Sequence, residues 1–261
     1  MADPLIELDQ IGKSFDGGRA FALRDVTLSL AQGSFTALVG QSGSGKTTTL
    51  KTINRLVEPD RGEVRIGGRA VRDQPGPQLR RGIGYVFQGI GLFPHLTVGE
   101  NIAAGPRLAG WAKDRTAARS LELLDLVALP RAVADRRPAE LSGGQQQRVG
   151  LARALAAGPK IMLMDEPFGA LDPVTRLELG DAYRALHQRL GLTTVMVTHD
   201  VQEAVLLADR VVVMKGGRVL ADDAPRNLLA GHPDPDVAAL MSTPRVQAER
   251  VAELMRSGPG G

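Results

Sequence analysis

The 261-residue sequence contains no cysteine, few aromatic side chains and no long run of apolar residues. Without cysteine there can be no disulfide and no thiolate metal site, which fits a reducing compartment. No stretch approaches the roughly 18 consecutive apolar residues of a membrane span. The N-terminal MADPLIELDQ also lacks the apolar run of a signal peptide. We therefore expect a soluble protein whose link to a membrane, if any, runs through a partner.

An excess of either charge is also missing, because 32 lysines and arginines stand against 29 aspartates and glutamates. Basic residues are spread along the chain rather than gathered in one stretch, so nucleic acid is not an expected partner. Hydrophobic residues make up 43% of the chain and charged residues 23%, as in ordinary globular proteins. The length allows one large domain or two small ones, with a buried core.

Short apolar runs rich in β-branched residues alternate with longer helical patterns. The strand-like runs lie at 34–40, 160–167, 193–200 and 210–217. The helical patterns occupy 47–56, 173–191 and 200–209, and the second of them begins with proline. This alternation predicts βαβ units, and hence an α/β fold with a mainly parallel sheet.

Three regions depart from the alternation. The early pieces LIELDQI, AFALRDVTLSL and EVRIGG alternate in polarity, which predicts an antiparallel β layer beside the main sheet. Residues 89–158 have helical patterns and are predicted to form a helical subdomain inserted between core segments 1–88 and 159–230. Residues 231–261 are predicted to form a tail. It holds two short amphipathic helices, PDVAALM and VQAERVAELMRS, and ends in a disordered Gly/Pro stretch.

The octapeptide GQSGSGKT at 40–47 matches the phosphate-loop pattern G-x-x-x-x-G-K-[ST]. It follows a predicted strand and opens a predicted helix, a context that favours this interpretation over a simple Gly/Ser turn. Backbone N–H groups of such a loop surround phosphate oxygens at a helix N-terminus. We expect Lys46 to reach the β- and γ-phosphates and the Thr47 hydroxyl to bind Mg²⁺. The predicted nucleotide-binding residues are Gly40, Gln41, Ser42, Gly43, Ser44, Gly45, Lys46, Thr47 and Thr48.

The run IMLMDEP at 161–167 predicts a partner strand for the phosphate loop. It places Asp165 at the carboxyl end of a buried strand, where ligands of α/β sheets bind. We expect Asp165 to hold Mg²⁺ through water and Glu166 to polarise the attacking water as general base. The alternative is an ordinary acidic turn before Pro167, which the presence of the phosphate loop disfavours.

A second glycine-rich helix start occurs in AELSGGQQQRVGLARAL at 139–155. Ser142 and Gln145 have the spacing of a capping box, which is the simplest interpretation. A cap does not need the two glycines at 143 and 144, and glycine suits a place where a ligand approaches the backbone closely. Together with the free N–H groups of the helix start, Ser142 is predicted to form a second anion site.

These motifs, LSGGQ between a phosphate loop and an MDEP strand, resemble the signature set of ATP-binding cassette (ABC) proteins over about residues 5–230. The resemblance implies a P-loop NTPase core with an antiparallel β layer and an inserted helical subdomain, hydrolysing ATP with Mg²⁺. In that family two cassettes pack head to tail, and the signature of one subunit caps the γ-phosphate held by the other. By this resemblance Ser142, Gly143, Gly144 and Gln145 would serve the ATP of a neighbouring subunit.

The resemblance also implies roles for four single residues. Phe15 stands where the family places an adenine-stacking aromatic, commonly Tyr; a core position is the alternative. Gln88, in YVFQ, matches the Q-loop glutamine that senses Mg²⁺, or is a surface residue after a strand. Asp172 matches the D-loop that contacts the opposite subunit, and an N-cap role competes. His199 matches the switch histidine that contacts the γ-phosphate, whereas a lone histidine is more often structural.

Residues 88–111, with TTTLKTINRLVEP and LSGGQQQRVGLARAL, resemble ATPases that power uptake of quaternary amines such as glycine betaine, choline and carnitine. The family implies a second ATPase subunit, an integral membrane permease, an extracytoplasmic solute-binding protein, and a peripheral place on the cytoplasmic face of the inner membrane. Phe93 and Pro94 suit a partly apolar groove for the permease. Many members continue into paired CBS domains, which are expected to be absent here because the chain ends at Gly261.

Other classes of ABC protein remain as alternatives. The chain could power another importer, an exporter or a lipid-trafficking system, although exporters often fuse the cassette to membrane spans. Non-transport ABC proteins carry long coiled-coil insertions or two cassettes, and the stretch between Lys46 and Ser142 is too short for the former. A metabolic P-loop kinase is excluded mainly by LSGGQ.

Overall fold

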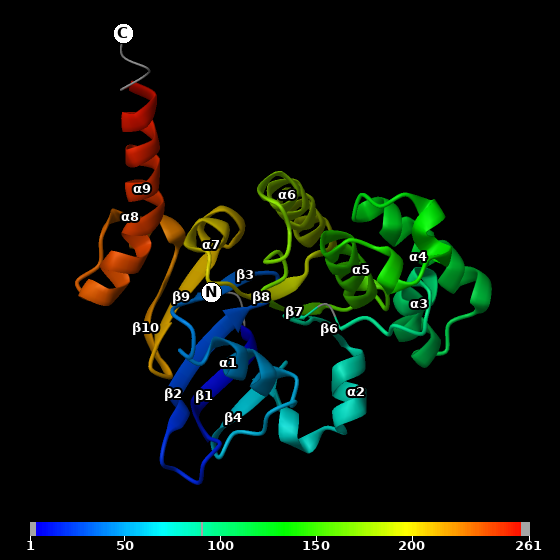
Figure 1. Ribbon diagram of the computed structural model, residues 1–261. Helices are drawn as coiled ribbons and strands as arrows, with labels where there is room; N and C mark the ends of the chain where they lie inside the picture. The colour runs from blue at the N-terminus through cyan, green and yellow to red at the C-terminus, as the bar shows by residue number, and fades with distance from the viewer. Residues whose placement is uncertain (1–3, 90, 257–261) are drawn as a thin grey trace.

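The computed structural model describes residues 4–89 and 91–256, and its centre is a six-stranded sheet (Figure 1). The strand order is β10-β9-β3-β8-β7-β6, and only the β10–β9 pairing is antiparallel. Every residue of β3, β7 and β8 is buried, which explains why their sequences are continuous apolar runs. The strands are β3 (Phe35–Val39), β6 (Ile83–Val86), β7 (Ile161–Asp165), β8 (Thr193–Val197), β9 (Arg210–Lys215) and β10 (Arg218–Asp223).

The predicted antiparallel β layer is present as a second sheet in the order β2-β1-β4-β5. Buried and exposed residues alternate along its strands, so one face is apolar. That face packs on the main sheet, because Ile6 and Leu8 share a buried cluster with Leu38, Leu50 and Leu163. Its strands are β1 (Pro4–Ser14), β2 (Phe21–Ala31), β4 (Arg61–Ile66) and β5 (Arg69–Ala70).

Helices α3, α4 and α5 pack on one another beside the β6 edge of the main sheet (Figure 1). They fall within the segment predicted to be helical, and the division into subdomains remains a prediction. The helices are α1 (Lys46–Ile53), α2 (Gly76–Arg81), α3 (Val98–Leu108), α4 (Lys113–Leu126), α5 (Gly143–Leu155), α6 (Pro173–Leu190), α7 (Val201–Leu207), α8 (Pro225–Ala230) and α9 (Pro235–Arg256). Short 3-10 turns occupy Val71–Asp73, Arg131–Asp135 and Pro138–Glu140.

The C-terminal region differs from the prediction, because α9 is one helix and not two short ones. Pro244 removes a backbone hydrogen bond inside it. The first turns are nevertheless anchored by Val237 and Met241, which are fully buried against the main core, and the helix continues beyond the proline. The Gly/Pro stretch predicted to be disordered lies outside the described residues.

Helices α2 and α8 and strand β10 were not predicted. Helix α2 is a six-residue helix, and β10 pairs with β9 through a hairpin whose turn residues Gly216 and Gly217 both have positive φ. That glycine pair is typical of a tight hairpin turn, so the sequence did carry a signal for β10. Among the described helices, none is both long and apolar enough to cross a bilayer.

Candidate functional site

The loop between β3 and α1 depends on glycine at two positions. Gly40 has a φ of 147° and Gly45 a φ of 101°, conformations that other residues rarely adopt. A Cβ atom on Gly40 would lie 2.2 Å from the carbonyl oxygen of Met214, and one on Gly45 would lie 2.6 Å from that of Ala22. The backbone can therefore curl between β9 and the β2 edge only without side chains at these places.

Lys46 folds back under this loop. Its Nζ donates hydrogen bonds to the carbonyl oxygens of Gly40 at 2.7 Å and Gln41 at 2.9 Å. The side chain is buried, and burial lowers the pKa of its ammonium group, while Glu166 and Asp165 oppose that shift. The ammonium group therefore lies inside the loop, at the place where a bound phosphate would meet it.

Thr47 and Asp165 join α1 to the end of β7. The Thr47 hydroxyl donates to Asp165 Oδ1 at 2.8 Å. Burial raises the pKa of Asp165, and the bond from Thr47 is the largest effect that opposes the rise. A hydroxyl beside a carboxylate offers the oxygen ligands that Mg²⁺ prefers, so these residues fit this ion. The described residues contain no cluster of three or more acidic or histidine side chains for a metal, so phosphates and water would complete the coordination shell.

Glu166 has a left-handed backbone, with a φ of 48°. Non-glycine residues adopt this conformation at a cost of about 1–3 kcal/mol, so the surroundings must hold it. Its N–H donates to Val197 O at 2.9 Å, and the side chain of Gln147 donates to its carbonyl oxygen at 3.1 Å. The carboxylate Oε2 lies 3.4 Å from Nδ1 of His199, whose side chain is mostly exposed on the turn after β8.

These residues surround a cavity of about 390 Å³. Segments after β3, β6, β7 and β8 meet there, at the carboxyl ends of the strands, where ligands of open α/β sheets bind. The cavity brings together much of the predicted set, and adds Ala22, which the sequence did not single out. Its lining residues are Ala22, Ser42, Gly43, Ser44, Gly45, Lys46, Thr47, Thr48, Gln88, Glu166 and His199.

Phe15 and Asp172 do not line this cavity. Phe15 is 66% exposed after β1, so the alternative that placed it in the core is wrong. The Lys13 ammonium lies 5.5 Å from its ring centroid. Asp172 caps α6, because its Oδ1 accepts from Thr175 N at 3.0 Å, and hydrogen bonds from Thr175 lower its pKa. The N-cap interpretation is thus confirmed, and a contact with another subunit remains a prediction.

The second glycine-rich helix start is exposed and lies outside the cavity. Its capping box is fully formed: Ser142 Oγ accepts from Gln145 N at 3.3 Å, and Gln145 Oε1 accepts from Ser142 N at 3.0 Å. A Cβ on Gly143 would meet no atom, whereas one on Gly144 would lie 3.2 Å from Leu171. Packing within the chain therefore gives a reason for Gly144 but none for Gly143.

Comparison with known proteins identifies the family to which this chain belongs. The family model described as ABC transporter matches residues 23–169. The choline transport ATP-binding protein OpuBA of Bacillus subtilis is 44% identical over 261 residues, an alignment covering 98% of this chain and 68% of that protein. The glycine betaine uptake system ATP-binding protein YehX of Escherichia coli is 50% identical over 225 residues, covering 86% of this chain and 72% of that protein. The chain thus spans about two thirds of these relatives' length.

A solved structure supports the same assignment. The dimeric post-hydrolysis state of an ATP-binding cassette bound to ADP and Pi superposes with a TM-score of 0.79 at 35% identity, covering 84% of this chain and 98% of that one. The fold is therefore that of a P-loop NTPase cassette. From its phosphate loop, its matched family model and these relatives, the chain belongs to the ABC transporter family and is an ATPase of the transport type.

Proposed function

We propose that this chain is the ATP-hydrolysing subunit of an ABC importer for quaternary amines such as glycine betaine or choline. The observation that supports it most is the cavity, which is lined by Lys46, Thr47, Glu166 and His199. Asp165 lies next to it, bonded to the Thr47 hydroxyl, and Glu166 lies against His199. This combination supplies a cation for phosphates, oxygen ligands for Mg²⁺ and a carboxylate for an attacking water.

ATP binding starts at the loop between β3 and α1. The Lys46 ammonium exchanges the carbonyl oxygens of Gly40 and Gln41 for oxygens of the β- and γ-phosphates, while N–H groups of residues 43–48 surround the phosphates. Thr47, Asp165 and Gln88 would hold Mg²⁺, which supplies neutralisation of the phosphate charge when bound. Phe15 offers an exposed ring on which adenine stacks.

Hydrolysis needs a positioned water. The Glu166 carboxylate accepts a proton from this water. The oxygen of the water bonds to the γ-phosphorus, and the bond from that phosphorus to the ADP oxygen breaks. His199 Nδ1 lies 3.4 Å from this carboxylate, which leaves the other ring nitrogen to contact the γ-phosphate. The left-handed backbone of Glu166, held from two sides, keeps the base at the edge of the cavity.

A second copy of the chain would complete the site. Ser142 and Gly143 are exposed in one chain, Gly144 and Gln145 are half-buried, and the open space at Gly143 permits close approach of a phosphate. Two copies packed head to tail would each place this helix start on the other's ATP, with Asp172 at the contact. Binding of ATP would close the pair, and hydrolysis would open it.

The surface after β6 is the proposed contact with the permease. Phe87 and Phe93 are 43% and 45% exposed there. The fully buried Asn101 shapes the segment, because its amide donates to Phe93 O at 3.1 Å and its Oδ1 accepts from Phe93 N at 2.8 Å. Arg153 of α5 donates to Gly91 O at 2.7 Å, so this surface is tied to the helix that begins at residue 143. The chain would sit peripherally on the cytoplasmic face of the inner membrane.

The experiment is co-purification followed by transport. Tagged Glu166→Gln chain would be recovered from gently solubilised membranes with ATP present, and Lys46→Ala, which should not bind ATP, is the control. We expect a multi-span permease and a solute-binding protein. The wild-type complex in proteoliposomes should then take up labelled glycine betaine or choline only with ATP. Uptake of unrelated solutes alone would contradict the quaternary-amine assignment, and export of lipid would contradict the importer assignment. Recovery of DNA-repair or ribosomal proteins without a permease would contradict transport itself.

A further inference from the structure

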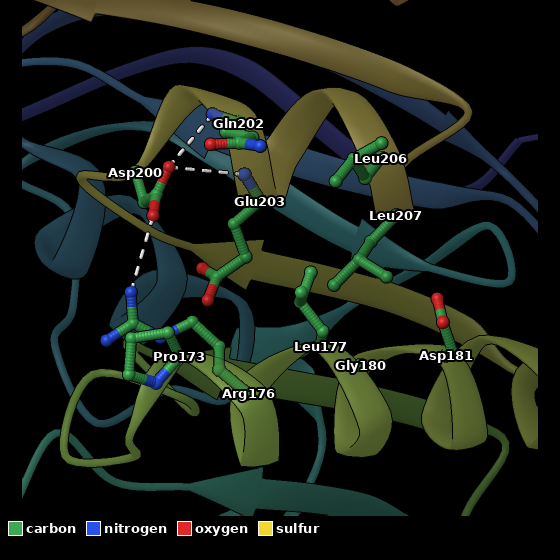
Figure 2. A pocket seen from close by; sticks show the side chains of 10 residues that line it. All are labelled: Pro173, Arg176, Leu177, Gly180, Asp181, Asp200, Gln202, Glu203, Leu206 and Leu207. Atoms are coloured by element: carbon green, nitrogen blue, oxygen red, sulfur yellow. Dashed lines mark hydrogen bonds and ion pairs between the residues drawn. The ribbon is translucent and has the colours of Figure 1, made fainter. Parts of the chain in front are cut away.

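A groove of about 270 Å³ lies between α6 and α7, and the Arg176 side chain extends from α6 toward Asp200 on the other side (Figure 2). One guanidinium nitrogen, Nη1, lies 3.5 Å from Asp200 Oδ2 on the α7 side. The other, Nη2, donates to the carbonyl oxygen of Leu171 at 3.1 Å. One side chain therefore bridges two turns that are 29 residues apart in sequence.

Both turns carry residues of the proposed site. Leu171 immediately precedes Asp172, and Asp200 immediately follows His199. Asp200 also fixes the start of α7, because its Oδ1 accepts from Gln202 N at 2.9 Å and Glu203 N at 3.3 Å. A displacement of the guanidinium would thus move the turn before α6 relative to the turn that carries His199.

The charges in the groove make Arg176 hard to replace. Glu203 points into the groove beside it. Burial raises the pKa of the Glu203 carboxyl, while a hydrogen bond from Thr198 and, to a smaller extent, the Arg176 charge oppose the rise. The Arg176 Nε is buried and has no hydrogen-bond partner among the described residues. Removing the guanidinium would take away a positive charge that acts on both the Asp200 and Glu203 carboxylates, which is unfavourable in a partly buried place.

We propose that Arg176 is a positioning residue that holds the His199 turn and the Asp172 turn in one fixed arrangement, so that the switch histidine meets the γ-phosphate only when the dimer-contact turn is in place. Arg176 touches no nucleotide and acts through these two turns. The inference rests on the proposed roles of His199 and Asp172.

The test compares four chains in the dimerised state: wild type, Arg176→Met, Asp200→Asn and the double variant. Asparagine keeps the N-cap acceptor of α7 but loses the charge that faces Arg176. We expect each single variant to lower kcat for ATP hydrolysis about tenfold, with KM for ATP within about twofold. The double variant should be no slower than the slower single variant, because both changes break one link. Additive losses, or an unchanged kcat in Arg176→Met, would overturn the proposal.

A matched control lies on the same helix. Arg184 forms an ion pair with Asp209 two turns further along α6, away from both turns. Arg184→Met should leave kcat within about twofold of wild type, although it also removes an ion pair. An equal loss of kcat in this control would mean that Arg176 matters only for the stability of α6.

Amide hydrogen exchange gives a readout that does not depend on hydrolysis. Arg176→Met should accelerate exchange in residues 198–204, and Arg184→Met should not. If the wild-type chain failed to hydrolyse ATP, the proposed function would fall, and the exchange result would still decide on the link between the turns. Unchanged exchange in Arg176→Met would overturn the link.

Discussion

The starts of α1 and α5 both offer glycine and free backbone N–H groups to an anion, but they are built differently. At the start of α1 the N-cap residue is Gly45, no side chain caps the helix, and Lys46 is buried beneath the loop. At the start of α5 Ser142 and Gln145 close a complete capping box, and no cation lies in the first turn. The first start, the walled site, lies in the cavity that is also lined by Gln88, Glu166 and His199. The second start, the open site, faces solvent.

This difference suggests different roles in phosphate binding for the two helix starts. In the proposed function, the α1 start would bind a triphosphate by itself, because charge, backbone donors and oxygen ligands come from one chain. The α5 start has a stable shape but little binding power of its own, since a single helix terminus contributes only about 1 kcal/mol at an exposed place. It can act on a phosphate only when another surface already holds that phosphate.

The largest expected effect is on the walled site. Glu166→Gln removes the proton acceptor, so kcat for ATP hydrolysis should fall at least about a hundredfold, while ATP affinity is kept. Phosphate release in single-turnover assays measures the rate of hydrolysis, and titration with labelled ATP measures the affinity. The exposed Glu178→Gln on α6 is the control and should hydrolyse at the wild-type rate. Hydrolysis by Glu166→Gln at that same rate would refute the base assignment.

The next largest effect is expected at the open site. Ser142→Arg places a bulky cation where a second subunit must approach, so hydrolysis should fall about a hundredfold. ATP affinity of the isolated monomer should stay within about twofold, because Ser142 does not line the monomer's cavity. Ser142→Thr keeps the capping hydroxyl and should remain active. An equal loss of monomer affinity in Ser142→Arg would contradict the division between the two helix starts.

A smaller effect is expected at the edge of the walled site. Phe15→Ala removes the ring on which adenine would stack, so KM for ATP should rise about three- to tenfold with kcat unchanged. Phe15→Tyr keeps the stacking face and should match the wild type. Steady-state hydrolysis over a range of ATP concentrations checks both. A Phe15→Ala chain with wild-type KM would place adenine elsewhere.

The smallest effect concerns a third helix start, that of α6. Asp172→Ala removes the acceptor for Thr175 N and should lower the free energy of unfolding. Asp172→Asn should retain most of this stability. Urea titration of the nucleotide-free chain measures both values. If Asp172 serves only as a cap, the asparagine variant will also hydrolyse ATP normally; a dimer-contact role predicts slower hydrolysis at unchanged stability.

The nucleotide-binding loop and the buried strands could be predicted because their patterns are local. Gly40, Gly45 and Lys46 follow one another within a single turn, and a strand buried on both faces needs a continuous apolar run. The capping box at Ser142 was also visible, since its two residues are three apart. Whether Phe15 lies on the surface, as the stacking role implied, or in the core was left open, because its burial depends on how the hairpin of β1 and β2 packs.

Other features depend on contacts between distant elements. No sequence pattern marks Gln147 as the side chain that holds the Glu166 backbone, or Arg176 as the link between α6 and α7. Pro244 lies between the two short helices that were predicted, whereas the structure has one helix, α9. The burial of Val237 and Met241 that anchors its first turns comes from the tertiary fold.

The hydrogen bond from Gln147 to the Glu166 carbonyl oxygen has a consequence for a pair of cassettes. Gln147 lies on α5, little more than one turn after Ser142, and Glu166 is the proposed base for the chain's own ATP. A phosphate arriving at the start of α5 would therefore bias the backbone that carries this base. The two ATP molecules of a dimer would then be energetically coupled, and hydrolysis should depend on ATP concentration with a Hill coefficient above one.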